Sequence, residues 1–195
     1  MSTDVQPSEV FPPPPGVTPV DDALIASFAE RAQALGAAVD EVDDLAGALD
    51  VIRRVAGDSS IVVAPELERR FPGFAAAAGG VALDDAHGRA VVEAAANAGV
   101  GVAYASMAIA ETGSVVIGEP TLADRVVTML TADVVVIVER DAFRRDLDAV
   151  AEELHDHAAP SYVALHSGPS RTADIERSLT IGVQGAVALR LVVVR

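Results

Sequence analysis

The 195-residue sequence contains no cysteine, no lysine and no tryptophan, and aromatic residues make up only 4% of it. Without cysteine the chain can form no disulfide, supply no thiol nucleophile and hold no iron–sulfur cluster by its own thiolates. Without lysine it can form no Schiff base, whether with a substrate or with pyridoxal phosphate, and no Walker-type phosphate loop. The dinucleotide and hydrolase-elbow fingerprints are missing as well.

Long hydrophobic runs are also absent. No apolar segment approaches the length of a membrane span, and residues 1–16 lack the apolar core of a signal peptide. We therefore expect a soluble, cytoplasmic protein without membrane contact. Four consecutive prolines predict that residues 1–17 form an extended, disordered arm, with contact across a second copy in a homo-oligomer as the alternative. Residues 18–195 are expected to form one domain.

The charge of the chain is strongly biased, with 29 acidic against 14 basic residues and a net charge of -15. Such a surface repels nucleic acid and anionic membranes, so neither is an expected partner. An acidic, lysine-free surface also fits a high-salt cytoplasm, where screening removes the repulsion between like charges.

Hydrophobic residues make up 51% of the chain and are mostly small and aliphatic, which suits buried parallel strands covered by alanine-rich helices. Short apolar runs predict strands at 61–64, 114–118, 134–138, 162–165 and 186–194. Helices are expected to start near Thr18, at Asp43 or Asp44, at Asp84 or Asp85, and at Asp141. Strands separated by helices of about 10–15 residues imply βαβ units, and hence an α/β fold with a mostly parallel sheet flanked by helices.

The most informative stretch is His166–Glu176, which follows the predicted strand 162–165 and precedes helix-like spacing at 175–181. Gly168 and Pro169 force a turn there. A strand that leads through a polar loop into a helix is a common anion site in α/β proteins, because free N–H groups and the helix dipole point toward the loop. Such loops lie beyond the carboxyl ends of the strands, where we expect this one.

Side chains of the same loop support an anion site. Ser170 and Thr172 can cap the expected helix, and Arg171 adds a positive charge that Asp174 can brace. His166 ends the strand beside the loop. The alternative interpretation is a well-capped turn that holds no ligand, with His166 as a structural histidine.

A second candidate is the turn Glu111-Thr112-Gly113, which lies between two apolar runs. Glu111 can act there as a general base, as a nucleophile or as an acceptor for a substrate hydroxyl. Its alternative role is to cap a free N–H at the surface. Arg125 can reach an anionic ligand or be an ordinary solvated arginine. The four histidines are not spaced as a metal site, so we expect neither a metal nor a bound cofactor.

The second half of the chain resembles the LUD domain family of lactate-utilisation protein C. The stretches that carry the resemblance are Ile109–Val116, Arg125 with Thr128 and Leu130, Gly168–Glu176 and Gly182–Gly185. The resemblance implies a fold similar to ribose-phosphate isomerase, glucosamine-phosphate deaminase and the CoA-transferases. It also implies a role in L-lactate utilisation beside iron–sulfur partner proteins that carry the electrons.

The chain departs from the family pattern at two histidines, which are replaced by Val134 and Gln184. Any proton transfer that relies on them would be lost. The first hypothesis is therefore an accessory or regulatory component that binds a small anionic ligand or the iron–sulfur partners. The alternative is an isomerase- or CoA-transferase-type enzyme for a small phosphorylated, carboxylate or CoA substrate, with Glu111 as base or nucleophile.

Overall fold

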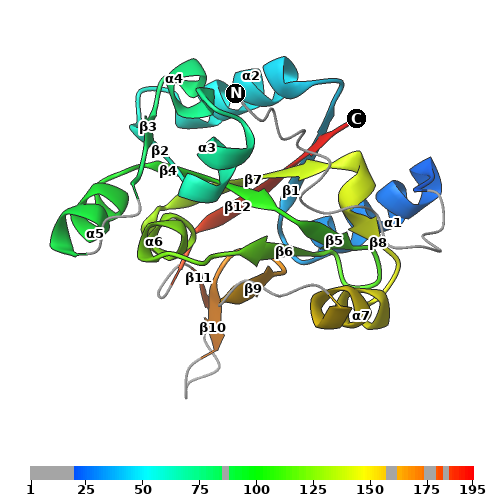
Figure 1. Cartoon of the computed structure of the whole chain (residues 1–195). Helices are drawn as coiled ribbons and strands as arrows, with labels where there is room; N and C mark the ends of the chain where they lie inside the picture. The colour runs from blue at the N-terminus through cyan, green and yellow to red at the C-terminus, as the bar shows by residue number, and fades with distance from the viewer. Residues whose placement is uncertain (1–19, 85–87, 157–161, 174–178, 182–184) are drawn as a thin grey trace.

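The computed structural model describes residues 20–84, 88–156, 162–173, 179–181 and 185–195, so the expected arm lies outside the described residues (Figure 1). The fold is built on a six-stranded sheet in the order β1-β12-β7-β4-β2-β3, and every neighbouring pair is parallel. Its strands are β1 (Ala38–Val42), β2 (Ile61–Val63), β3 (Val81–Ala82), β4 (Val100–Ala105), β7 (Asp133–Glu139) and β12 (Ala188–Val194). The predicted α/β class with a mostly parallel sheet is confirmed.

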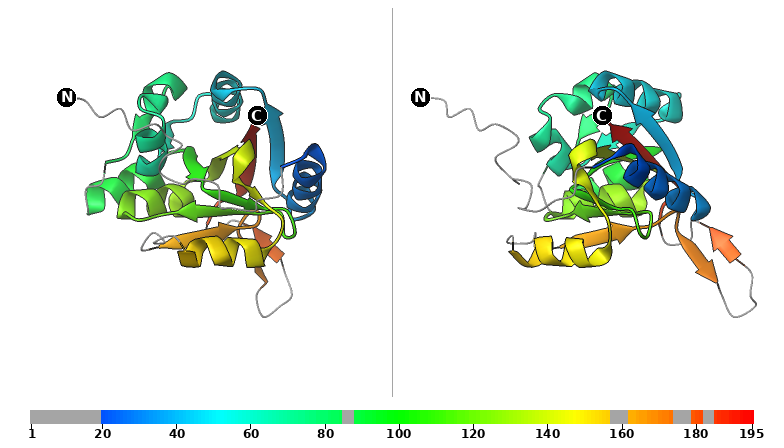
Figure 2. Two further views of the ribbon diagram at one scale, coloured as in Figure 1. Left: turned by 45° about the vertical axis from the view of Figure 1, so that its right-hand side comes forward. Right: turned by 90° about the vertical axis from the view of Figure 1, so that its right-hand side faces the viewer.

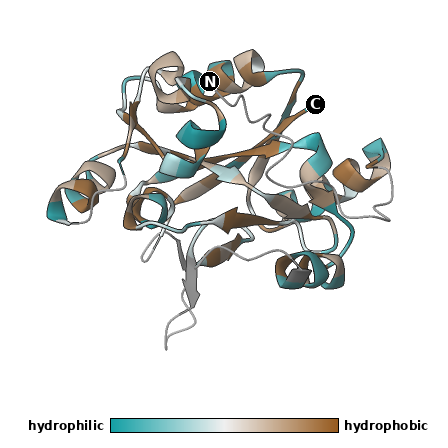
Figure 3. Cartoon of the chain, viewed as in Figure 1, coloured by the Kyte–Doolittle hydropathy of each residue, from teal (hydrophilic) through white to brown (hydrophobic). Residues whose placement is uncertain are grey.

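Helices cover both faces of this sheet, because alternate strand residues point to opposite sides. Figure 3 shows predominantly apolar strands and helices in which polar and apolar residues mostly alternate. One face is covered by α2 (Leu45–Ala56), α3 (Pro65–Arg70) and α4 (Phe74–Ala78). The other face is covered by α1 (Asp22–Ala34), α5 (Arg89–Ala96) and α6 (Leu122–Leu130). No helix in the described ranges is long and apolar enough to cross a membrane.

A second, four-stranded sheet packs on the α1 side and has the order β8-β5-β6-β9. Its strands are β5 (Met107–Ile109), β6 (Ser114–Gly118), β8 (Phe143–Arg144) and β9 (Val163–His166), and helix α7 (Leu147–Asp156) packs against it. A 3-10 turn, Arg140–Ala142, precedes β8. The strands β10 (Arg171–Ala173) and β11 (Leu179–Ile181) form a separate antiparallel pair that projects beside β9 (Figure 2).

Several helix starts follow the local signals in the sequence. The Asp44 carboxylate accepts a hydrogen bond of 2.8 Å from the Gly47 N–H, so the predicted cap of α2 is confirmed. In α6, Thr121 and Asp124 form a reciprocal capping box. These caps satisfy N–H groups that have no partner within the helix.

Other predicted helices are wrong in part. The helix expected to start at Asp141 begins only at Leu147, because the intervening residues form the 3-10 turn and β8. Helix α5 begins at Arg89 after Gly88, so Asp84 does not cap it, and Asp85 lies outside the described residues. The helix expected over 175–181 is also wrong, since Leu179–Ile181 is a strand paired with Arg171–Ala173. Short segments rich in threonine and isoleucine favour strands, and this preference prevails there over the helix-like spacing.

Candidate functional site

The Gly168–Ser170 loop lies at the opposite edge of the main sheet from the one we expected. Ser170 N–H donates a 2.9 Å hydrogen bond to the carbonyl of Ala186, which precedes β12. A Cβ atom on Gly168 would lie 2.7 Å from the carbonyl oxygen of Leu35, which precedes β1. The loop therefore lies at the amino ends of the parallel strands. The prediction failed because β9, which leads into it, belongs to the second sheet and runs antiparallel to β6.

The turn at Glu111–Gly113 and the loop after β9 do approach the same element. Gly113 has a φ of 67°, and a Cβ atom there would lie 2.7 Å from the Arg31 carbonyl carbon in the last turn of α1. Gly168 packs against Leu35 at the end of the same helix. The hydroxyls of Ser114 and Ser167 are 2.6 Å apart and join the two segments directly. Close packing against the end of α1 thus explains why glycine occupies positions 113 and 168.

Glu111 itself occupies a capping position. Its exposed carboxylate accepts a 3.3 Å hydrogen bond from the N–H of Leu147, the first residue of α7. Next to it, the Thr112 hydroxyl is buried without a hydrogen-bond partner in the described part of the chain. The geometry at Glu111 is that of the helix-capping alternative rather than of a free base.

His166 lies beside one buried carboxylate, that of Glu119. The Glu119 side chain is completely buried, and its Oε1 accepts a hydrogen bond from Thr128. His166 Nε2 lies 3.8 Å from the same oxygen, while Oε2 has no hydrogen-bond partner among the described residues. Arg125 reaches this region from α6, with its guanidinium 5.4 Å from the ring centre of Tyr162. The Tyr162 carbonyl in turn accepts the Glu119 N–H at 2.9 Å.

Sequence reasoning missed Glu119, although a signal was present. The residue directly follows the strand Ser114–Gly118 and precedes Pro120, a place where a polar side chain at a strand end can be enclosed by the next helix. A buried carboxylate that lacks full hydrogen bonding carries a large desolvation cost, so such groups are often found at functional sites. His166 is therefore the sequence-predicted residue that the fold brings to a chemically unusual position.

The remaining predicted residues are less informative. Pro169 lies half-buried in the loop, and the backbones of Arg171 and Thr172 belong to β10, so neither residue starts a helix. Asp174 and Gln184 lie outside the described residues. Val134, which replaces a family histidine, is buried in the core at the start of β7.

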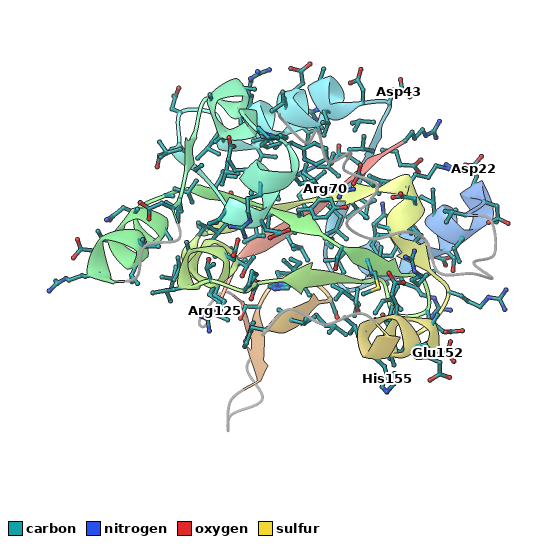
Figure 4. The ribbon with its side chains drawn as sticks, in the orientation of Figure 1. Asp22, Asp43, Arg70, Arg125, Glu152 and His155 are labelled. Atoms are coloured by element: carbon teal, nitrogen blue, oxygen red, sulfur yellow. The ribbon has the colours of Figure 1, made fainter. Side chains whose placement is uncertain are left out.

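A second polar cluster lies at the carboxyl ends of the parallel strands. Glu139 is the last residue of β7, and its Oε2 accepts hydrogen bonds from Arg70 Nε at 2.7 Å, from Arg70 Nη2 and from the Tyr104 hydroxyl at 2.7 Å. The Arg70 guanidinium lies 4.6 Å from the ring centre of Tyr104 and 5.6 Å from that of Phe71. Arg70 and Arg125, both labelled in Figure 4, come from helices on opposite faces of the sheet.

The environment of Tyr104 keeps its hydroxyl protonated, so that it can donate a hydrogen bond. Burial, reinforced by the charge of Glu139, raises the pKa of Tyr104 far above its usual range, so the phenol retains its proton. The signal missed in the sequence is positional: Tyr104 and Glu139 lie at the carboxyl ends of two apolar strands. No group of three or more potential metal ligands occurs among the residues that the structure describes.

Comparison with known proteins identifies the family. The LUD domain model matches residues 25–194, which is most of the chain. The chain belongs to the LUD domain family. A Deinococcus radiodurans protein of the DUF162 family has the same fold, with a TM-score of 0.57 at 18% identity, over 89% of this chain and 97% of that one.

Proteins of similar sequence come from several bacteria. Lactate utilization protein C of Halalkalibacterium halodurans is 34% identical over 116 residues, which cover 57% of this chain and 50% of that protein. Lactate utilization protein C of Geobacillus kaustophilus is 31% identical over 112 residues. YkgG of Escherichia coli is 31% identical over 140 residues, or 67% of this chain and 61% of YkgG. The matched part thus spans about half the length of the proteins named for lactate utilisation.

Proposed function

We propose that this LUD domain protein serves L-lactate utilisation as an accessory or regulatory component. In this role it binds a small carboxylate and works beside iron–sulfur proteins that carry the electrons. The observation that carries the proposal is the 34% identity over 116 residues to a protein named lactate utilization protein C. The chain has no cysteine, so thiolate-held clusters must be supplied by other chains.

The geometry at Glu111 favours this role over the isomerase- or CoA-transferase-type alternative. A base or nucleophile needs a carboxylate that is free to approach a substrate atom. The Glu111 carboxylate instead accepts the first N–H of α7. For the anion itself, the sequence suggests Arg125, whose guanidinium lies 5.4 Å from the Tyr162 ring centre, and His166, which lies beside Glu119.

Deletion of the gene in its host tests the proposal. We expect the deletion strain to grow slowly on L-lactate, to grow normally on pyruvate, and to recover on L-lactate when the gene is restored. Pyruvate is the matched control because it is the oxidation product of lactate and bypasses the step in question. Equal growth of the two strains on L-lactate would show that the protein has no role in this pathway.

A further inference from the structure

The connections between strands change direction at the carboxyl edge of the main sheet. From β2 the chain passes through α3 and α4 to β3, whereas from the neighbouring β4 it passes to β7 on the other side. Adjacent strands whose connections leave in opposite directions have a gap between them beyond their carboxyl ends. Ligands of open α/β sheets bind at such a switch point. Arg70 follows β2, Tyr104 lies in β4 and Glu139 ends β7, so the polar cluster lies at this edge.

The hydrogen bonds within the cluster are unevenly distributed. Three donor groups from Arg70 and Tyr104 converge on Glu139 Oε2, while Oε1 receives none from the described residues. Arg70 Nη1 likewise has no hydrogen-bond acceptor among them. The side chains of Arg70 and Glu139 are 19% and 29% exposed, so solvent can reach both. Arg70 Nη1 and Glu139 Oε1 are therefore a cationic donor and an anionic acceptor without a hydrogen-bond partner among the described residues.

These features match the chemistry of a small 2-hydroxycarboxylate. The Nη1 group of Arg70 can donate a charge-assisted hydrogen bond to a ligand carboxylate, and the rings of Phe71 and Tyr104 hold the guanidinium in place. A carboxylate oxygen such as Glu139 Oε1 accepts a hydrogen bond from a hydroxyl. The Phe71 ring, 6.2 Å from that of Tyr104, offers an apolar surface for a short alkyl group.

We propose that Arg70, Tyr104 and Glu139 form a binding site for a short 2-hydroxycarboxylate of the lactate type. Arg70 binds the ligand carboxylate, and Glu139 Oε1 accepts a hydrogen bond from the ligand hydroxyl. Tyr104 positions the Glu139 carboxylate through its own hydrogen bond to Oε2. This inference rests on the proposed function for its choice of ligand, and it assigns the ligand to a different face of the sheet from Arg125.

Calorimetric titration of the full chain tests the site, with L-lactate, propionate and L-lactamide as probes. Propionate lacks the hydroxyl and lactamide lacks the charged carboxylate, so we expect each to bind at least tenfold more weakly than L-lactate. Arg70→Gln should weaken L-lactate binding at least tenfold, and Arg70→Lys should do so by less. Tyr104→Phe, which keeps the ring, should weaken binding severalfold. Arg89→Gln is the matched control, since Arg89 is an exposed arginine on α5 that pairs with Glu93.

Thermal denaturation of each variant establishes that it is folded before binding is compared. Loss of affinity in Arg70→Gln with unchanged affinity in Arg89→Gln supports the site. Wild-type affinity in a folded Arg70→Gln overturns it, as does loss of binding only in Arg125→Gln. Absence of L-lactate binding to the wild type also overturns it. None of these results decides the proposed function, because growth of the deletion strain tests that separately.

Discussion

The Glu119 carboxylate depends on a single hydroxyl for its hydrogen bonding in the described part of the chain. Thr128→Val would keep the shape of that side chain and leave both carboxylate oxygens without a donor. We expect the free energy of unfolding to fall by about 1–3 kcal/mol, the usual cost of a buried unpaired polar group. Urea denaturation measures this change.

A double-mutant cycle supplies the control for this prediction. In a Glu119→Met background there is no carboxylate to satisfy, so Thr128→Val should cost much less than in the wild type. Equal costs in the two backgrounds would mean that the hydrogen bond between Thr128 and Glu119 contributes nothing to stability.

Glu111 permits a similar test of its capping role. Glu111→Ala removes the acceptor for the first N–H of α7, and we expect a loss of about 0.5–1 kcal/mol in the free energy of unfolding. Glu111→Gln keeps an oxygen acceptor and should lose less. If the alanine variant unfolds at the same urea concentration as the wild type, the cap has no energetic role.

The turn between β5 and β6 approaches α1 so closely that the stability of the fold should depend on glycine at position 113. Gly113→Ala would force a Cβ atom into the backbone of Arg31 and Ala32, at a positive φ that side chains avoid. We expect a loss of about 3 kcal/mol from backbone strain and overpacking combined. Thermal or urea unfolding measures the loss.

Gly79→Ala is the matched control for that element. Gly79 also has a positive φ, of 78°, but nothing lies within 4 Å of the position that a Cβ atom would take. We expect it to lose only about 1 kcal/mol, from backbone conformation alone. Equal losses at the two positions would contradict a close contact between the turn and α1.

Strands β2, β7 and β12 were predicted from sequence because they are largely buried and read as continuous apolar runs. The central strand β4 was not, since glycines interrupt its apolar run. Strand β1 was not predicted: it is an edge strand that carries charged residues, and its Asp40 forms an ion pair with Arg190 of β12. Strand β11 was mistaken for the end of a helix, and β10 for part of the loop, because a short segment does not distinguish the two periods.

The candidate site residues, like the strands, were predicted from the sequence only in part. Local signals predicted the Glu111 turn, the Gly168 loop and the two basic residues, Arg125 and His166. They could not predict which edge of the sheet the loop occupies, because that depends on β9 joining the second sheet. Nor could they assemble Arg70, Tyr104 and Glu139, which are brought together only by the pairing of strands far apart in sequence.

For the whole molecule, the net charge of -15 predicts that salt stabilises the fold. Repulsion among carboxylates opposes the compact state, and salt screens it. We expect Tm to rise with KCl, mostly below 1 M, where the Debye length falls from about 10 Å to about 3 Å. A Tm that is the same in dilute buffer and in 1 M KCl would contradict this account of the surface.

We propose above that the carboxyl edge of the main sheet binds a small 2-hydroxycarboxylate. A crystal structure of the protein grown with L-lactate would locate the ligand. We expect lactate density beside Arg70 and Glu139, with the carboxylate on the guanidinium and the hydroxyl directed at Glu139. Lactate bound beside Arg125 and His166 instead, or no lactate at Arg70 under conditions where the protein binds it in solution, would rule out binding at this edge.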